Sequence, residues 1–159
     1  MRVSLLACVL ILSSSTWAQE HKFFEECDKK APTGSQAYLN DCAHADYQSA
    51  ENELNQAYEE LLKKAADEPV AVEKIKAAQS AWVAFRNAQI AALYPHDVPD
   101  KRLEYGTVYP MCVSLLKSEL TQQRTKMLRE MLHPLEDDVC SNGLYYPERT
   151  NLPKHQQNR

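Results

Sequence analysis

Charged and amide side chains recur at helical spacing inside otherwise apolar runs of this 159-residue sequence, and they are the residues best placed to do chemistry. Spacings of three and four residues put each group of them on one face of a helix. The arginines among them suit either an anion site or pairing with neighbouring acids and amides, because a buried charge needs a partner. We interpret the set as a structural network of buried polar groups. Its members are Glu53, Asn55, Tyr58, Gln79, Arg86, Thr121 and Arg124.

A second candidate site is the loop that the sequence predicts at residues 95–108, which contains two prolines, a glycine and several charges. Long loops between helices frequently carry binding residues, so we take this loop as the candidate contact surface for a protein partner. The alternative is that its first three residues only end the preceding helix and leave the histidine exposed. The candidate contact residues are Pro95, His96, Asp97, Asp100, Lys101 and Arg102.

Other kinds of chemistry have little support in the sequence. The five histidines are scattered, and His44-x-Asp46, the closest pair, has the wrong spacing for a metal site on one helix face. No serine lies in a glycine-flanked elbow, and the three glycines form no phosphate-binding loop. We therefore expect no catalytic residue, no metal and no cofactor.

Three long amphipathic helices are predicted to position these residues. Apolar residues alternate at spacings of three and four over residues 36–66, with Ser35 as the N-cap. Pro69 begins a second helix, about 70–93, and a third follows Thr107, its expected N-cap, and closes at His133-Pro134. The inward residues predicted for the last two helices include Phe85, Leu93 and Met127. Because short links favour antiparallel neighbours, we expect an all-α, up-down-up three-helix bundle followed by an irregular tail at 135–159.

The N-terminus has the pattern of a secretory signal peptide at residues 1–18. Arg2 precedes an apolar run over residues 3–12, and Thr16-Trp17-Ala18 is a small-x-small cleavage site. A lipoprotein anchored through Cys8 is the alternative, which we disfavour because the apolar run continues past that cysteine. We therefore expect a soluble periplasmic or secreted protein with its helical domain at 19–134, since no other stretch is long enough to span a bilayer.

The charge balance is acidic. The chain has a net charge of −4, and without Arg2 its 17 lysines and arginines stand against 22 acids, which gives −5. Nucleic acid is disfavoured as a partner, because binding it rewards basic patches. A basic protein partner is mildly favoured through long-range steering. The sequence leaves the oligomeric state open.

Four cysteines remain after residue 18, and an even number in an oxidising compartment predicts disulfide bonds. Cys27–Cys42 is the most local pairing, and it would leave Cys112 to pair with Cys140. A Cys42–Cys112 bond is also open, because both residues lie near helix starts at the same end of the expected bundle. The residues alone do not choose among the three possible connectivities.

In order and spacing, the motifs resemble the lysozyme inhibitor LprI family, also called DUF1311. The resemblance covers about residues 27–132 and rests on Cys42, Glu53-Leu54-Asn55-x-x-Tyr58, Gln79-x-x-Trp82-x-x-Phe85-Arg86, Cys112 and Thr121-x-x-Arg124-x-x-x-Leu128. The family usually has a cysteine where this chain has Ile90, as the likely partner of the residue at position 112. The resemblance therefore favours Cys27–Cys42 together with Cys112–Cys140.

The resemblance implies an exported protein that binds and inhibits a lysozyme. Pro95-His96-Asp97 is also similar to a loop of a different family, the inhibitor of vertebrate lysozyme, which presents such a tripeptide to the enzyme's cleft. There a histidine can meet the two catalytic carboxylates. The alternative function is an envelope stress or interaction module with a non-lysozyme protein partner.

Overall fold

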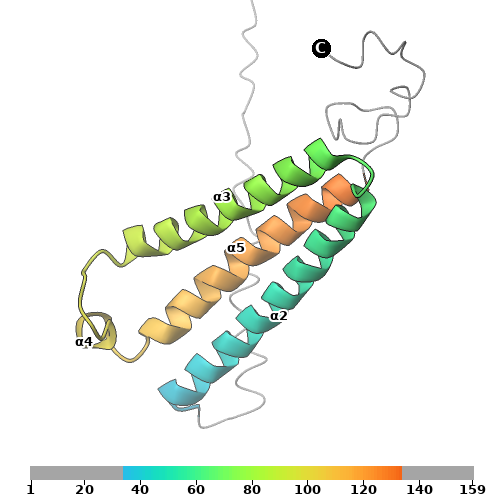
Figure 1. The fold of residues 1–159 in the computed structure, drawn as a ribbon. Helices are drawn as coiled ribbons and strands as arrows, with labels where there is room; N and C mark the ends of the chain where they lie inside the picture. Colours follow the sequence, from blue (N-terminus) through green and yellow to red (C-terminus); the bar gives the residue numbers. More distant parts are fainter. Residues whose placement is uncertain (1–33, 134–159) are drawn as a thin grey trace, which may run out of the picture.

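The computed structural model describes residues 34–133 and contains four helices: α2 (Gln36–Lys64), α3 (Pro69–Leu93), α4 (Arg102–Tyr105) and α5 (Tyr109–Leu132) (Figure 1). No strand occurs within those residues, so the predicted all-α class is confirmed. The expected signal peptide, Cys8, Cys27, Cys140 and the expected tail at 135–159 lie outside the described residues. None of the described helices is long and apolar enough to cross a membrane.

The helix ends follow local chemistry. The Ser35 hydroxyl accepts a hydrogen bond of 3.3 Å from the amide of Tyr38, which satisfies one free donor at the start of α2. Pro69 occupies the first turn of α3, where a missing N–H has no cost. The predicted cap at Thr107 is wrong: α5 has Val108 as its N-cap residue, with no side-chain bond.

The predicted 95–108 loop contains the short helix α4, which sequence periodicity could not reveal because it is only one turn long. The helix ends at Gly106, whose φ of 77° lies in the left-handed region that favours glycine. This residue turns the chain from α4 toward α5.

Helices α2 and α5 run in the same direction, and α3, which lies between them in sequence, runs in the opposite direction (Figure 1). At one end, the side-chain amide of Asn40 donates to the carbonyl of Thr107 over 3.1 Å. At the other, the Lys64 ammonium donates to the carbonyl of Leu132. These two bonds join the starts and the ends of α2 and α5, so the two helices are in register over their whole length.

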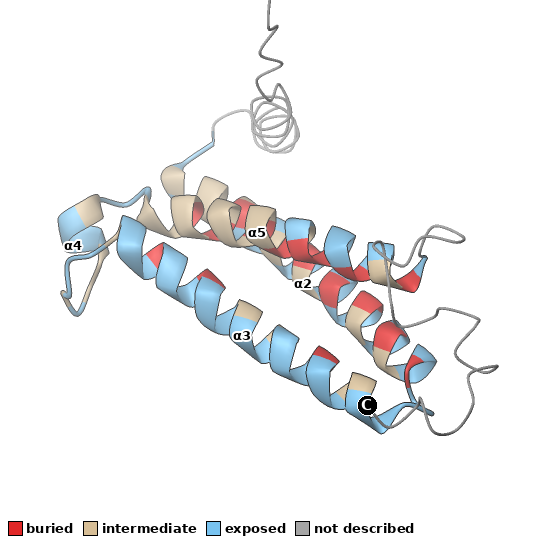
Figure 2. Cartoon of the chain, turned by 90° about the horizontal axis from the view of Figure 1, so that it is seen from above, coloured by how far each residue is buried: buried red, intermediate tan, exposed pale blue. Residues whose placement is uncertain are grey.

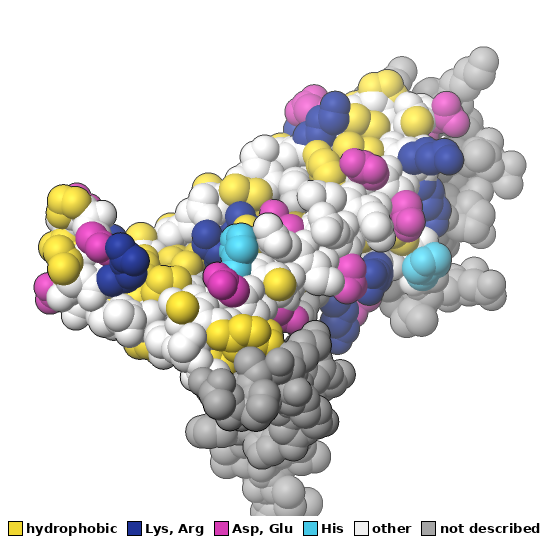
Figure 3. Space-filling view, turned by 90° about the horizontal axis from the view of Figure 1, so that it is seen from below, with side chains coloured by type: hydrophobic (Ala, Val, Ile, Leu, Met, Phe, Trp, Pro, Cys, Tyr) yellow, Lys and Arg dark blue, Asp and Glu magenta, His cyan; other side chains and the backbone are white. Residues whose placement is uncertain are grey.

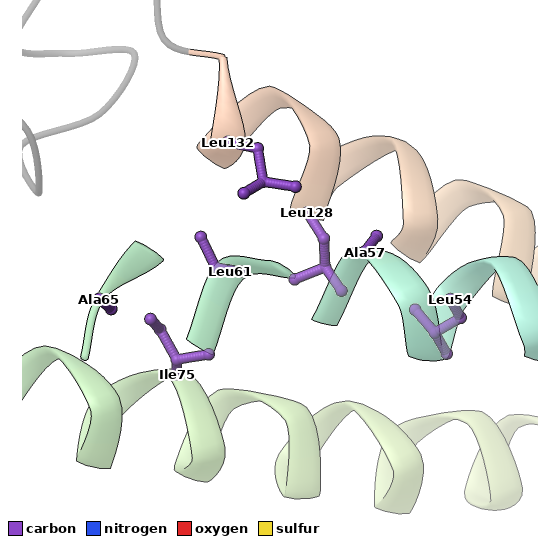
Figure 4. Packing of buried hydrophobic residues seen from close by; sticks show 7 residues of the cluster. All are labelled: Leu54, Ala57, Leu61, Ala65, Ile75, Leu128 and Leu132. Atoms are coloured by element: carbon purple, nitrogen blue, oxygen red, sulfur yellow. The ribbon is translucent and has the colours of Figure 1, made fainter. Parts of the chain in front are cut away.

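The apolar core lies mainly between α2 and α5 (Figure 2), and the close-up in Figure 4 shows leucines of α5 packing against those of α2. Leu54, Leu61 and Leu128 are almost fully buried, which makes them the largest contributors to apolar burial. One residue of α3, Ile75, completes the cluster. Its members are Leu54, Ala57, Leu61, Ala65, Ile75, Leu128 and Leu132.

Helix α3 is the most exposed of the long helices, as Figure 2 shows, and only Ile75, Arg86 and Ile90 are buried along it. The predicted inward positions of Phe85 and Leu93 are wrong, since these residues are 55% and 54% exposed. Met127 of α5, at 53%, is likewise not in the core. The reason at Phe85 is geometric: neighbouring residues on a helix point about 100° apart, and Arg86 takes the inward direction.

Candidate functional site

A layer of polar side chains connects the three long helices halfway along their length. Arg86 of α3 is 8% exposed, and its Nη1 pairs with Oε1 of Glu51 on α2. The same Nη1 donates to the Thr121 hydroxyl of α5 over 3.4 Å, and that hydroxyl donates to Glu51, also over 3.4 Å. Each of the three helices thus contributes one side chain to a closed triangle of polar contacts.

Two aromatic rings flank the Arg86 guanidinium, at 4.9 Å from the ring centre of Trp82 and 5.8 Å from that of Tyr47. Rings at these distances stabilise a cation through their π faces. Burial raises the pKa of the Tyr47 hydroxyl, and the nearby Arg86 charge partly offsets that rise. On its other side, the Tyr47 ring lies 5.3 Å from the Lys117 ammonium. Only the Nε of Arg86 is buried without a hydrogen-bond partner in the described part of the chain.

Further polar contacts extend the layer along the helices. The Ser118 hydroxyl donates to Oδ2 of Asp46 over 2.7 Å, which adds a second link between α2 and α5. Arg124 Nε donates to Oε1 of Gln79 over 3.1 Å, which adds a link between α5 and α3. Burial lowers the pKa of Arg124.

The structure brings together four of the seven residues predicted for the polar network, as two separate pairs: Arg86 with Thr121, and Gln79 with Arg124. The other three lie elsewhere. Glu53 pairs with Arg129 at the surface over 3.1 Å, Asn55 is exposed, and Tyr58 packs against the apolar cluster.

Sequence reasoning missed three members of the layer, Glu51, Asp46 and Ser118. Helical spacing carried a signal for the first of them, because Glu51 follows the inward Tyr47 by four residues and precedes the core residue Leu54 by three. Glu53, two residues farther, points to a different side of the helix. The E-L-N-x-x-Y motif therefore predicted Glu53 as the buried acid, whereas Glu51 is the acid that pairs with Arg86.

The loop at residues 94–108 is held in shape by its own side chains. His96 Nδ1 lies 2.7 Å from Oε1 of Glu104, and the Lys101 ammonium donates to the His96 carbonyl. Asp100 accepts from Arg102 three times, at its backbone N (3.0 Å), Nε (2.9 Å) and Nη2 (2.8 Å). These bonds from Arg102 lower the pKa of the Asp100 carboxyl. The structure therefore brings His96, Asp100, Lys101 and Arg102 of the predicted contact residues into one braced segment, with Pro95 and Asp97 exposed beside it.

Three tyrosines fix this loop to the helices. Tyr94 at the end of α3 meets the rings of Tyr105 and Tyr109 edge-on, at 5.1 Å and 5.0 Å, and those two rings stack at 5.6 Å. The Tyr105 hydroxyl also accepts from the His96 amide over 2.9 Å. Aromatic pairs in these geometries stabilise a structure beyond the area that they bury.

Cys112 has a free thiol, so the predicted bond between Cys112 and Cys140 is not present. Cys112 lies in the first turn of α5, close to Tyr94. Burial raises the pKa of the Tyr94 hydroxyl, and the Cys112 thiol raises it further. A Cys42–Cys112 bond is likewise absent, because the Cys112 thiol is free. The pairing of Cys27 with Cys42 stays a prediction, because Cys27 lies outside the described residues.

A groove along α5, with Glu53 of α2 at its side, is lined by residues of both signs of charge. The Glu53–Arg129 pair forms part of its wall. Within residues 34–133, no cluster of three or more histidines, cysteines or acids has the geometry to hold a metal ion.

Comparison with known proteins places these features in a family. The family described as lysozyme inhibitor LprI matches residues 27–128, a span that contains the polar layer and the whole braced loop. The chain is also 30% identical over 148 residues to uncharacterized protein R02472 of Rhizobium meliloti (strain 1021), which covers 86% of this chain and 100% of that protein. No solved structure matches it. On these grounds the chain belongs to the LprI family of lysozyme inhibitors.

Proposed function

We propose that this protein is an exported binding protein that inhibits a lysozyme-type muramidase by occluding the enzyme's cleft. The observation that carries the proposal is the family match over residues 27–128. The alternative, an envelope interaction module with a different protein partner, has no comparable observation in its favour.

The 94–108 loop is the surface that best suits such contact. The polar layer around Arg86 is too buried to meet another protein, since that arginine is 8% exposed. The loop, in contrast, lies at one end of the helices (Figure 1) and presents His96 with 60% of its side chain exposed. A loop already fixed by its own contacts loses little conformational freedom on binding, which favours affinity.

His96 is the residue that we propose to face the enzyme's two catalytic carboxylates. Its hydrogen-bond contact with Glu104 engages Nδ1 and orients the ring, which leaves Nε2 as the second nitrogen for a partner. When the ring is protonated, both nitrogens donate, and Nε2–H is then a suitable donor to a carboxylate.

The acidic balance of the chain would assist encounter with a basic enzyme. A net charge of −4 attracts a cationic partner over long range and raises the association rate. Inhibition that depends on such steering weakens as salt screens the charges.

Export would bring the protein to its partner. Proteins of this family are exported, and the pattern of residues 1–18 supports cleavage after Ala18 and release into the periplasm or the medium. A lipid anchor at Cys8 remains the disfavoured alternative.

The test is titration of the processed protein, purified from the periplasm, against chicken-, goose- and invertebrate-type lysozymes in a cell-wall lysis assay at low and physiological salt. We expect stoichiometric inhibition of one class, stronger at low salt. No inhibition of any class, together with binding to endogenous envelope proteins, would replace this function with the interaction-module alternative.

A narrower prediction concerns the histidine. Replacement of His96 by Ala should weaken inhibition about 10-fold or more, in line with the loss of a hydrogen bond to a charged group in an interface. The thermal unfolding midpoint should stay within a few degrees of the original, because the side chain is mostly exposed. Full potency of the variant would remove His96 from the contact.

A further inference from the structure

Leu103 is the most exposed large apolar side chain of the described residues, at 83%. It lies in α4, at the end of the molecule where α3 ends and α5 begins (Figure 1). A single exposed leucine is ordinary on a protein surface and needs no function. Its surroundings therefore decide whether it has one.

The residues on both sides of Leu103 are held by side-chain contacts. Arg102 is held by three hydrogen bonds to Asp100, and Glu104 is held by His96. The amide of Leu103 donates to the carbonyl of Asp100 over 3.0 Å, and α4 closes at Gly106. Local contacts therefore hold α4 in place, although this one-turn helix buries none of its residues.

Charged residues of both signs adjoin Leu103 along the chain, and they are paired within the loop. Figure 3 shows the arrangement as hydrophobic side chains beside basic and acidic ones at the α4 end. Asp100 with Arg102, and His96 with Glu104, are ion or hydrogen-bond pairs 2.8 Å and 2.7 Å long. Protein–protein interfaces commonly have an apolar centre and a polar rim, and Leu103 with these neighbouring pairs offers both kinds of group in one short segment.

We propose that Leu103 is the anchor of the inhibitory surface, and that it inserts into an apolar subsite within the cleft of the bound muramidase. This inference rests on the proposed function, because it assigns a contact residue to the same loop. The braced turn holds the leucine outward before the enzyme arrives, so insertion buries apolar area at little cost in conformational entropy. The Asp100–Arg102 and His96–Glu104 pairs then form the polar rim of the interface. Charges in such a rim add little affinity, but like charges facing each other across it are costly.

The test compares two exposed apolar residues in the same protein. Leu103→Ser removes the proposed anchor, and Val70→Ser is the matched control, because Val70 is 68% exposed at the opposite end of α3. Binding to the lysozyme that the unaltered protein inhibits is measured by calorimetry. We expect Leu103→Ser to raise Kd about 10- to 100-fold, as the burial of one leucine predicts. Leu103→Met should retain most of the affinity, and Val70→Ser should leave Kd unchanged.

The outcomes separate the inference from the function on which it rests. If the unaltered protein inhibits a lysozyme and Leu103→Ser binds equally well, the anchor is wrong and the function stands. If both serine variants lose affinity to the same extent, exposed apolar area in general is responsible, and the anchor is again wrong. If the unaltered protein inhibits no lysozyme class, the proposed function fails, and the anchor fails with it.

A second measurement locates the contact. A photo-reactive amino acid at position 103 should crosslink to enzyme residues that line the cleft, as peptide mapping of the product by mass spectrometry would show. A crosslink confined to the enzyme surface away from the cleft would overturn the insertion, even if the affinity had fallen.

Discussion

The polar layer around Arg86 and the braced 94–108 loop use the same kinds of side chains for opposite purposes. In the layer, the Arg86 and Glu51 side chains are 10% and 30% exposed, and the two residues, on different helices, are 35 positions apart in sequence. In the loop, the Arg102 and Asp100 side chains are 61% and 40% exposed and only two residues apart. Burial, rather than hydrogen-bond geometry, distinguishes the two regions.

The difference indicates where stability and where recognition reside. A buried pair stabilises the packing of distant helices only while both partners are present, because either charge alone is costly to bury. An exposed pair contributes little free energy, since water screens it, but it still fixes the shape of the few residues around it. A protein surface can therefore be shaped by ion pairs that hardly affect its unfolding.

The largest expected difference between the regions comes from removing one arginine from each. Arg86→Ala leaves Glu51 unpaired beside Thr121, and we expect it to lower the free energy of unfolding by about 3 kcal/mol. Arg102→Ala should change it far less, because both members of the Arg102–Asp100 pair are exposed to water. Urea denaturation followed by circular dichroism would measure both.

A double-mutant cycle with Glu51→Gln then tests whether the layer acts as a unit. Arg86→Ala and Glu51→Gln should be strongly non-additive, because each removes the same contact. Equal losses for Arg86→Ala and Arg102→Ala, or additive losses within the cycle, would abolish the distinction between the two regions.

A smaller effect is expected at Arg124, which is also buried but bonds an amide rather than a carboxylate. Because burial already disfavours its charge, replacing it with an apolar residue relieves that penalty. Arg124→Ala should lower the free energy of unfolding by about 2 kcal/mol through the lost hydrogen bond and lost packing of the side-chain stem. Arg124→Met restores the packing, so thermal melting of this variant should lie closer to the original protein. A methionine variant as unstable as the alanine one would show that the charge itself is required.

The smallest expected effect is a shift in the titration of Asp100. Its pKa is lowered from the ordinary value of 3.8, chiefly by hydrogen bonds from Arg102. A depressed folded-state pKa means that the pair is intact above pH 3.8 and is lost as the pH falls through the lower, folded-state value. NMR titration of the carboxyl carbon should give a midpoint below 3.8 in the original protein and a return toward 3.8 in Arg102→Ala. The same midpoint in both proteins would mean that the pair does not form in solution.

Periodicity predicts the long helices well because each buries a stripe of apolar residues. On α2, the buried residues Ala43, Ala50, Leu54, Ala57 and Leu61 lie on one face at the spacing that the sequence predicts. The prediction of inward residues fails on α3, because this helix has more apolar residues than buried positions. No pattern in one helix can state how far that helix lies from its neighbours, so Phe85 and Leu93 looked like core residues.

In the candidate sites too, helical spacing predicts some residues and does not reveal their partners. Arg86 and Arg124 were found because arginine at helical spacing inside an apolar stripe is unusual. Their actual partners, Glu51 and Gln79, depend on the rotation of one helix relative to another, and the sequence indicated only the second. The bracing of the 94–108 loop depends on contacts between residues with no periodic relation, such as His96 and Glu104. Only the three-dimensional structure shows them.

The register of α2 with α5 has a consequence for how the molecule comes to be folded. The core joins the first and last described helices, and Leu61 and Leu128, both fully buried, are far apart along the chain. Contacts of such high contact order form slowly and need the whole intervening chain. A nascent polypeptide that ends before α5 therefore has no core to close. The apolar face of α2 therefore stays without its main partner until α5, the last of the described helices, is available.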